Sequence, residues 1–183
     1  MSGEFEFKST ILRPVSLVGM MGSGKSLIGR RIAGALNLPF IDSDAEVEKA
    51  AGISISEIFE LAGEKKFRDI ERRVVTNAVG DGPIILSTGG GSICNSETAQ
   101  LLCSETTIIW LRAEPETLMT RIGSTNSRPM LHGDDPLDLL RRLSTKRAPD
   151  YAKAHITVNT DGLSAVGAAN AVMRALDTHL AVT

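Results

Sequence analysis

The chain has 183 residues, 42% of them hydrophobic and 23% charged, with a formal net charge of −2. These values are ordinary for a one-domain globular protein, and they exclude the basic surface that binds nucleic acid. No apolar run reaches the roughly 20 residues that span a bilayer, and the first residues lack the apolar core of a signal peptide. We therefore expect a cytoplasmic monomer with one domain over 1–183 and a short N-terminal extension over 1–13, without nucleic-acid or membrane partners.

Short apolar runs alternate with amphipathic segments of helical length along the chain. The apolar runs predict strands at 15–18, 39–41, 84–86, 106–111 and 155–158. Apolar residues at helical spacing predict helices at 25–36, 44–51, 54–63, 64–78, 96–102, 115–121, 136–146 and 163–180. The stretch 123–135 has no periodicity and is dense in Gly, Ser, Asn, Asp and Pro, which predicts a mobile loop. The alternation indicates an α/β fold with a parallel sheet of about five strands and helices on both faces.

A phosphate-binding loop follows the first predicted strand. Residues Gly19 to Ser26 read GMMGSGKS and fit the pattern G-x-x-x-x-G-K-[ST] at the start of a predicted helix, as the motif requires. Its glycines let backbone N–H groups converge on phosphate oxygens, Lys25 can reach the β- and γ-phosphates, and the Ser26 hydroxyl can bind Mg²⁺. A glycine-rich turn that binds nothing would not need Lys and Ser at these offsets. The pattern therefore predicts a nucleoside triphosphate site made of Gly22, Ser23, Gly24, Lys25, Ser26 and Leu27.

The carboxylates near this loop indicate a small kinase. The third strand ends without the Asp that many P-loop proteins use for Mg²⁺, and the chain contains no N-K-x-D pattern. Instead, Asp42 and Asp44 follow the second strand. Two apart on an extended segment, they would share one face and point toward the γ-phosphate. Alternatively, Asp44 is the N-cap of the next helix, a position that favours Asp, and the spacing supports both readings equally.

Five pieces of sequence, in this order, resemble the shikimate kinase family. They are the phosphate loop, Asp42-Ser43-Asp44, Phe67-Arg68-Asp69-Ile70-Glu71, Gly89-Gly90-Gly91, and Arg128-Pro129 followed by Lys146-Arg147-Ala148-Pro149-x-Tyr151. The resemblance implies a three-layer P-loop kinase fold. It also implies transfer of the γ-phosphoryl group of ATP to the 3-hydroxyl of shikimate with one Mg²⁺ per subunit, in the pathway to chorismate and the aromatic amino acids.

The resemblance assigns residues to the acceptor. It implies that Asp44 binds the ring hydroxyls and is the catalytic base, that Arg68 and Arg147 bind the carboxylate, and that the triplet Gly89, Gly90 and Gly91 offers N–H groups and room for the ring. Planar guanidinium groups suit a carboxylate through paired hydrogen bonds. As alternatives, Arg68 forms ion pairs with Glu64 or Glu71 on its own helix, and Arg147 is a cation at a helix C-terminus. For Arg68 the two readings are compatible, because Glu71 can orient it.

The resemblance also assigns residues to the nucleotide and the metal. Asp42 helps to hold Mg²⁺ through water, with Ser26, and Lys25 and Arg128 complete the catalytic set. Arg128 lies in a lid over about 121–135 that closes over the phosphates, and Arg121 stacks on the adenine.

Two positions depart from the family pattern. Leu27 stands where many members carry Thr, and Asn159-Thr160-Asp161 lacks the Arg or Lys that the family often places near the adenine, which leaves room for other nucleotides. The rival functions are a kinase for gluconate or a nucleotide, and a nucleotide-binding regulator without turnover. The presence of Lys25, Asp44 and Arg128 disfavours the regulator.

Overall fold

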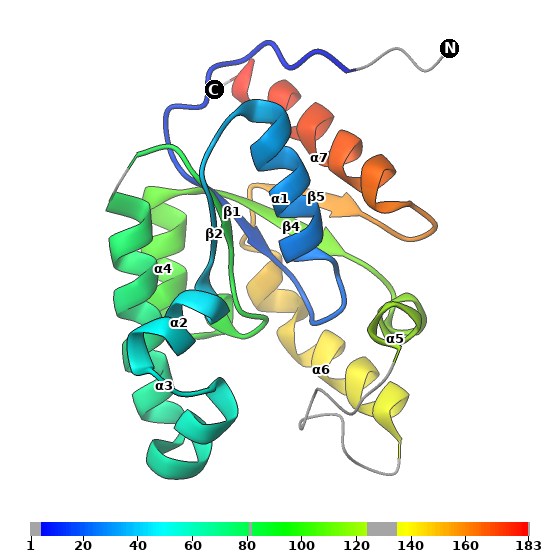
Figure 1. The fold of residues 1–183 in the computed structure, drawn as a ribbon. Helices are drawn as coiled ribbons and strands as arrows, with labels where there is room; N and C mark the ends of the chain where they lie inside the picture. Colours follow the sequence, from blue (N-terminus) through cyan, green and yellow to red (C-terminus); the bar gives the residue numbers. More distant parts are fainter. Residues whose placement is uncertain (1–4, 81, 124–134, 183) are drawn as a thin grey trace.

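The computed structural model describes residues 5–80, 82–123 and 135–182, and a five-stranded parallel sheet forms its centre (Figure 1). The strands are β1 (Val15–Val18), β2 (Phe40–Asp42), β3 (Ile85–Ser87), β4 (Thr107–Arg112) and β5 (Ile156–Asn159). Their order in the sheet is β2-β3-β1-β4-β5, and every neighbouring pair is parallel. The five predicted strands are confirmed, the first with its exact bounds and the other four shifted by one residue.

Helices cover both faces of the sheet. On one face, Val15 and Leu17 of β1 share a buried core with α1 (Lys25–Leu36) and α7 (Ala165–Leu180). On the other face, Val18 shares a core with α3 (Ile55–Gly80), α4 (Ser96–Glu105), α5 (Pro115–Ile122) and α6 (Pro136–Tyr151). Because successive strand side chains point to opposite faces, one strand supplies both cores. The three-layer α/β prediction is confirmed.

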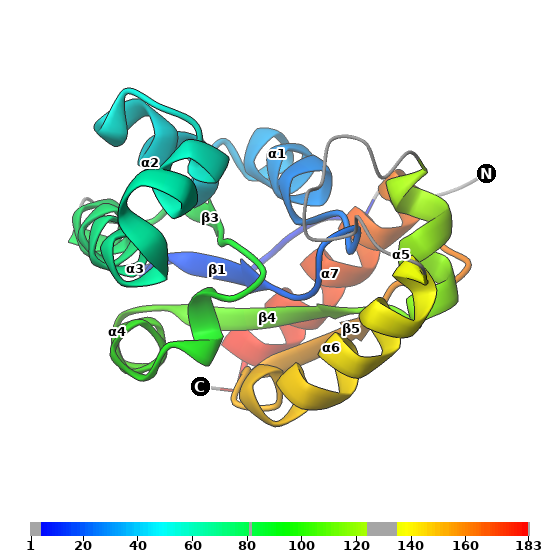
Figure 2. The same cartoon turned by 90° about the horizontal axis from the view of Figure 1, so that it is seen from below.

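Two helical arms lie on either side of the phosphate loop (Figure 2). One arm consists of α2 (Ser43–Ala51) and α3, which bury Val47, Ile58 and Phe67 between them. The other consists of α5 and α6, joined on their surfaces by an ion pair between Glu116 and Arg141. The strand ends and the loop form the floor between the two arms, and α3, α5 and α6 share the core on this face of the sheet.

Most predicted helix ends lie within three residues of the observed ends, and one does not. The Ser54–Glu57 capping box is present, with Glu57 Oε2 2.8 Å from Ser54 N and Ser54 Oγ 3.2 Å from Glu57 N. Gly63 breaks the helix as predicted, with φ 75° inside α3. However, α6 continues past the predicted end at 146 and past Pro149 to Tyr151. Tyr151 is buried and stacks on Trp110, so tertiary packing outweighs the proline.

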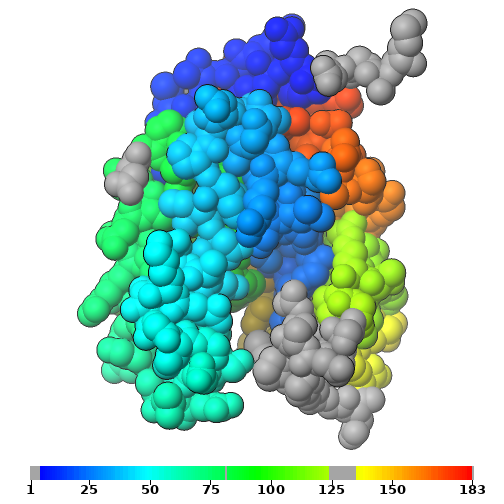
Figure 3. Space-filling view, in the orientation of Figure 1, coloured from blue at the N-terminus to red at the C-terminus, as the bar shows by residue number. Residues whose placement is uncertain are grey.

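The described part of the N-terminal extension lies against α7 (Figure 3). The backbone N–H groups of Lys8 and Ser9 donate to Asp177 Oδ1 at 3.1 and 2.7 Å, and Phe5 and Phe7 pack on the core beneath α1 and α7. Within the described ranges, no helix has both the length and the apolar character needed to cross a bilayer. The predicted lid residues 124–134 lie outside the described residues.

Candidate active site

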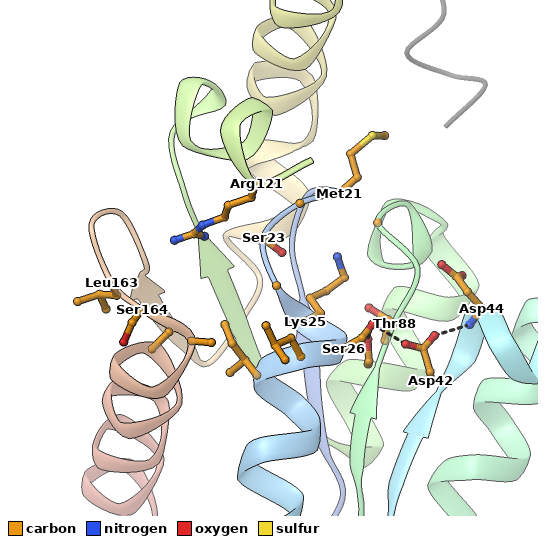
Figure 4. Close-up of a pocket in the computed structure, with 18 residues that line it drawn as sticks. Met21, Ser23, Lys25, Ser26, Asp42, Asp44, Thr88, Arg121, Leu163 and Ser164 are labelled. Atoms are coloured by element: carbon orange, nitrogen blue, oxygen red, sulfur yellow. Dashed lines mark hydrogen bonds between the residues drawn. The ribbon is translucent and has the colours of Figure 1, made fainter. Parts of the chain in front are cut away.

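A cavity of about 540 Å³ opens at the C-terminal ends of the central strands (Figure 4). This volume lies in the range of roughly 300–1,000 Å³ typical of small-molecule sites, and the strand ends are where α/β folds bind ligands. The phosphate loop and the start of α1 form the floor. One wall contains Asp42, Asp44, Ser87, Thr88 and Gly90, and the other contains Arg121, Leu163, Ser164, Ala165 and Ala168.

The phosphate loop has the backbone that an anion site requires. Gly24 is the N-cap of α1 with φ 90°, and no side chain in the described chain caps this helix. The first N–H groups of α1 are therefore left for a ligand. Gly22 has φ 79°, and a Cβ there would lie 2.8 Å from Ile122 Cγ1 and 2.9 Å from Leu118 O. Only glycine lets the loop pack so closely against α5.

Lys25 and Arg121 are the two cationic side chains in the described lining of this cavity, and Lys25 lies in its floor. Its side chain is 9% exposed, and Nζ donates to the carbonyl oxygens of Gly19 and Met20 at 2.8 and 3.0 Å. These bonds hold the amine beside the loop, in the cavity that Lys25 lines. The arrangement can stabilise negative charge on a bound nucleotide.

Ser26, Asp42 and Ser87 bring three oxygen-bearing side chains together beside the loop. Ser26 Oγ donates to Asp42 Oδ2 at 2.5 Å and lies 3.3 Å from Ser87 Oγ. Asp42 pairs with Ser87 across β2 and β3, which explains how residues far apart in sequence meet. Hydroxyl and carboxylate oxygens are ligands suited to Mg²⁺.

The structure corrects the predicted geometry of the two aspartates. They do not share an extended segment, because β2 ends at Asp42 and α2 begins at Ser43. The cap of α2 is Asp42, whose Oδ1 accepts from the backbone N–H of Asp44 at 3.2 Å. The alternative that Asp44 is the N-cap is therefore wrong. Asp44 lies one residue inside the helix, and its side chain still lines the cavity.

Asp44 has an unusually weakly acidic carboxyl group. Burial, followed by the negative charges of Asp42, Glu71 and Glu48, raises its pKa from 3.8 to about 6, against the opposing effect of Lys25. A carboxyl group with a pKa near neutrality can exchange a proton with a substrate at cellular pH.

The glycine triplet allows charged side chains to approach the backbone closely. A Cβ on Gly89 would lie 2.7 Å from Asp44 Oδ1, and a Cβ on Gly91 would lie 2.7 Å from Arg68 Nη2. The N–H of Gly89 donates to Ser43 Oγ at 3.0 Å. The N–H groups of Gly90 and Gly91 have no hydrogen-bond partner among the described residues. Two donors of the triplet are thus left for a ligand.

Two arginines reach this glycine loop from different helices. Arg68 of α3 lies against Gly91, and Arg147 of α6 donates from Nη1 to the carbonyl oxygen of Gly90 at 3.3 Å. The C-terminal-cation alternative for Arg147 is wrong, because the extended α6 has no basic residue in its last turn. The two guanidinium groups beside this loop are of the kind that can bind a carboxylate.

The ion-pair reading of Arg68 is confirmed. Its Nη1 lies 2.7 Å from Oε2 of Glu71, and its Nη2 lies 3.2 Å from Glu64. Glu71 has no exposed surface, and its other oxygen accepts from Ser92 Oγ at 2.6 Å. Glu71 therefore orients the arginine. Sequence reasoning did not find Ser43 or Ser92, because serines carry no distinctive spacing.

Arg121 lies on the opposite wall, as part of the cavity lining. Its Nη1 donates to Thr160 Oγ1 at 2.9 Å, and its Nη2 donates to the Thr160 carbonyl oxygen. Leu163, Ser164 and Ala165 line the cavity beside it and were missed from the sequence. Their position after the last parallel strand was the available signal. Arg128 lies outside the described residues.

This geometry can be compared with known proteins. A family model described as shikimate kinase matches residues 21–177. A shikimate kinase of Caulobacter vibrioides is 44% identical over 164 residues, covering 90% of this chain and 82% of the relative. The shikimate kinase of Nitrobacter winogradskyi is 47% identical over 146 residues, covering 80% of this chain and 68% of the relative.

Solved structures agree with these matches. A shikimate kinase from Acinetobacter baumannii in complex with shikimate has a TM-score of 0.82 and 34% identity, with 90% of each chain covered. The shikimate kinase from Aquifex aeolicus has a TM-score of 0.78 and 30% identity, with 93% of this chain and 99% of that chain covered. A gluconokinase from Sinorhizobium meliloti has a TM-score of 0.56 and 16% identity, which shows a shared fold and nothing more.

Fold and site together define a P-loop kinase of the kind that phosphorylates small molecules. Within that class, the chain belongs to the shikimate kinase family.

Proposed function

We propose that this chain is a shikimate kinase that transfers the γ-phosphoryl group of ATP to the 3-hydroxyl of shikimate. One observation carries the proposal: Arg68 and Arg147 meet at neighbouring glycines of one loop, and that loop borders the phosphate cavity through Gly90. A carboxylate bound by the arginines would place the rest of a small acceptor near the nucleotide. The relatives named shikimate kinases, and the neighbour crystallised with shikimate, support this acceptor.

The nucleotide would occupy the cavity over the phosphate loop. Gly22, Ser23, Gly24, Lys25, Ser26 and Leu27 would surround its phosphates, and Arg121 would stack on the adenine. Ser164 and Ala165, at the start of α7, would border the base. Arg128 would close over the phosphates as part of the lid. These assignments to the nucleotide are part of the proposal.

The side chains around Ser26 fit a magnesium ion. Mg²⁺ retains several waters and takes one or two protein ligands in addition to substrate phosphates. Ser26 and Asp42, with Ser87 nearby, provide such a set. The ion would neutralise charge on the phosphates when bound. The described residues contain no cluster of three or more His, Cys, Asp or Glu side chains for a metal, and a site of this kind does not require one.

Phosphoryl transfer relies mainly on positioning and charge stabilisation. Arg68 and Arg147 would hold the carboxylate of shikimate beside the glycine triplet. Asp44 would orient the 3-hydroxyl and accept its proton as the oxygen attacks the γ-phosphorus and the bond to ADP breaks. Its raised pKa suits this exchange. Lys25 and Arg128 would stabilise the charge on the transferred group.

The proposal also includes a single kinase domain over 1–183 that acts as a cytoplasmic monomer. Its size supports this, because 19.5 kDa is ordinary for one domain. Light scattering of the purified chain at micromolar concentration would measure the mass directly. A dimeric mass would reject the monomer and leave the chemistry unaffected.

A coupled assay of ADP release tests the function. Shikimate, gluconate and nucleoside monophosphates are offered in turn with ATP and Mg²⁺, and only shikimate should support rapid turnover. Lys25→Ala serves as the catalytic control and should lose at least about 10²-fold in kcat, the scale of one preorganised charge contact. Lys49→Ala, at an exposed lysine, should behave like the parent. Faster turnover of gluconate or a nucleotide would reject shikimate as the acceptor.

A further inference from the structure

Tyr151 connects the end of α6 to the glycine loop. The side chain is 1% exposed, and its hydroxyl donates to the carbonyl oxygen of Gly90 at 2.6 Å across 61 residues of sequence. Its ring stacks on Trp110 with centroids 5.5 Å apart, and it belongs to the lining of a second cavity of about 350 Å³. The phenol is therefore a donor held in place by its own packing and directed at one atom of the loop.

This hydrogen bond determines which way the Gly90–Gly91 peptide faces. A trans peptide is planar, and its C=O and N–H point in opposite directions; the described residues contain no cis peptide bond. Because the Gly90 carbonyl points to Tyr151 on α6, the Gly91 N–H points away from α6. That N–H has no partner within the described ranges, and Arg68 lies against Gly91. A backbone donor beside a guanidinium group suits a carboxylate oxygen.

The peptide needs such an anchor because glycines flank it. Glycine restricts φ and ψ less than any other residue, so the Gly90–Gly91 peptide can rotate more readily than one between bulkier residues. A rotated peptide would turn the carbonyl oxygen toward the acceptor and repel its carboxylate. Arg147 also donates to the Gly90 oxygen, but at 3.3 Å, and the proposed function requires its guanidinium group for the acceptor.

We propose that Tyr151 is a positioning residue that holds the Gly90–Gly91 peptide so that the Gly91 N–H faces the carboxylate of the acceptor. The inference rests on the proposed function, which supplies shikimate as that acceptor. Burial raises the pKa of Tyr151 to about 12, so the phenol remains a donor throughout the pH range in which the protein would be assayed.

Tyr151→Phe removes the hydroxyl and keeps the ring on Trp110. Loss of one hydrogen bond should raise the KM for shikimate about 3- to 10-fold, with kcat and the KM for ATP within about twofold of the parent. Ser16→Ala is the matched control, because it removes a buried hydroxyl that bonds Thr106 at 2.7 Å on the sheet. It should lower Tm and leave the KM for shikimate unchanged.

The amide signal of Gly91 gives a second readout in glycine-labelled protein. Its ¹⁵N shift should move when shikimate is added to the parent, and should move less in Tyr151→Phe. If the parent binds shikimate and Tyr151→Phe matches it in both KM and amide shift, the positioning role is wrong and the proposed function stands. If kcat and both KM values change together with Tm, Tyr151 is only structural. If the parent does not bind shikimate, both proposals fail.

Discussion

Asp42 accepts a hydrogen bond from the backbone N–H of Asp44, 3.2 Å from its Oδ1. This bond caps α2, and it leaves the side chain of Asp44 available to the cavity that both residues line. The two carboxylates therefore have different roles although they are two residues apart. One ends a strand and begins a helix beside Ser26, and the other faces the glycine loop.

Asp44→Asn should slow turnover by at least about 10²-fold, because loss of a general base typically costs about 10²–10⁴ in rate. The cap on α2 is unaffected, since Asp42 provides it. Titration with ADP is the control and should give a Kd within a few-fold of the parent. Full activity in a folded Asp44→Asn protein would remove Asp44 from the mechanism.

The same variant should be more stable than the parent at neutral pH. Burial and neighbouring negative charges raise the pKa of Asp44 from 3.8 to about 6, so the folded protein binds this proton more tightly than the unfolded chain does. The ionised carboxylate therefore lowers the free energy of unfolding as pH rises from about 4 to 6, and the loss persists above that range. The ligand-free variant should exceed the parent in Tm at pH 7.5, with a smaller gain at pH 4.5. An equal gain in Tm at both pH values would indicate that the pKa of Asp44 is not raised in the folded protein.

Asp42→Asn should weaken the response to magnesium. Asn caps helices as well as Asp does, so α2 should remain folded and Tm should change little. The neutral amide is a poorer partner for a hydrated cation than a carboxylate. The Mg²⁺ concentration for half-maximal activity should rise, and high Mg²⁺ should restore part of the rate. A defect that no Mg²⁺ concentration relieves would exclude a metal-linked role for Asp42.

Arg68 can be tested with a substrate analogue that carries a neutral amide in place of the carboxylate. Replacement by Ala would leave Glu71 charged, buried and unpaired, which is strongly destabilising, so Arg68→Lys is the better variant. It keeps a positive charge and loses the planar fork. Shikimate should bind about tenfold more weakly or worse, since a hydrogen bond to a charged group contributes about 1.5–3 kcal/mol. The amide should be little affected.

Arg72→Ala is the matched control for Arg68. Arg72 lies one turn further along α3 and pairs with Glu97 on the surface, where its side chain is 43% exposed. Exposed ion pairs contribute little to stability, so Arg72→Ala should bind shikimate and the amide analogue as tightly as the parent does. If Arg68→Lys weakens the binding of shikimate and of the amide analogue equally, Arg68 is wrongly assigned to the carboxylate.

Thr160→Val should weaken nucleotide binding through Arg121. The substitution keeps the shape of the side chain and removes the hydroxyl that accepts from Arg121 at 2.9 Å. Loss of the bond from Arg121 predicts a rise in the KM for ATP of about 3- to 10-fold, with the KM for shikimate unchanged. The hydroxyl also donates to the Arg112 carbonyl oxygen at 3.1 Å, and loss of that bond should lower Tm. Thr160→Ser should retain the parent value. The control is Thr120→Val on α5, where the hydroxyl donates to the Glu116 carbonyl oxygen of its own helix. If Thr120→Val raises the KM for ATP as much as Thr160→Val does, Thr160 has no specific role.

Features that depend on local spacing could be predicted from the sequence. The phosphate loop was readable because Lys25 and Ser26 must follow Gly24 directly for the backbone N–H groups, the amine and the hydroxyl to converge. The capping box of Ser54 and Glu57 and the break at Gly63 were readable for the same reason, since each involves residues within one helical turn. Short apolar runs also predicted all five strands.

Contacts between residues far apart in the sequence could not be predicted and required the folded structure. Ser43 supports Gly89 across 46 residues, and Tyr151 supports Gly90 across 61. The first contact depends on the pairing of β2 with β3, and the second depends on α6 continuing past Pro149. Spacing likewise left two roles open for Asp44, and pairing of β2 with β3 settled the cap in favour of Asp42. Strand order and helix length depend on how the whole chain buries its apolar surface. A local pattern of residues does not contain that information.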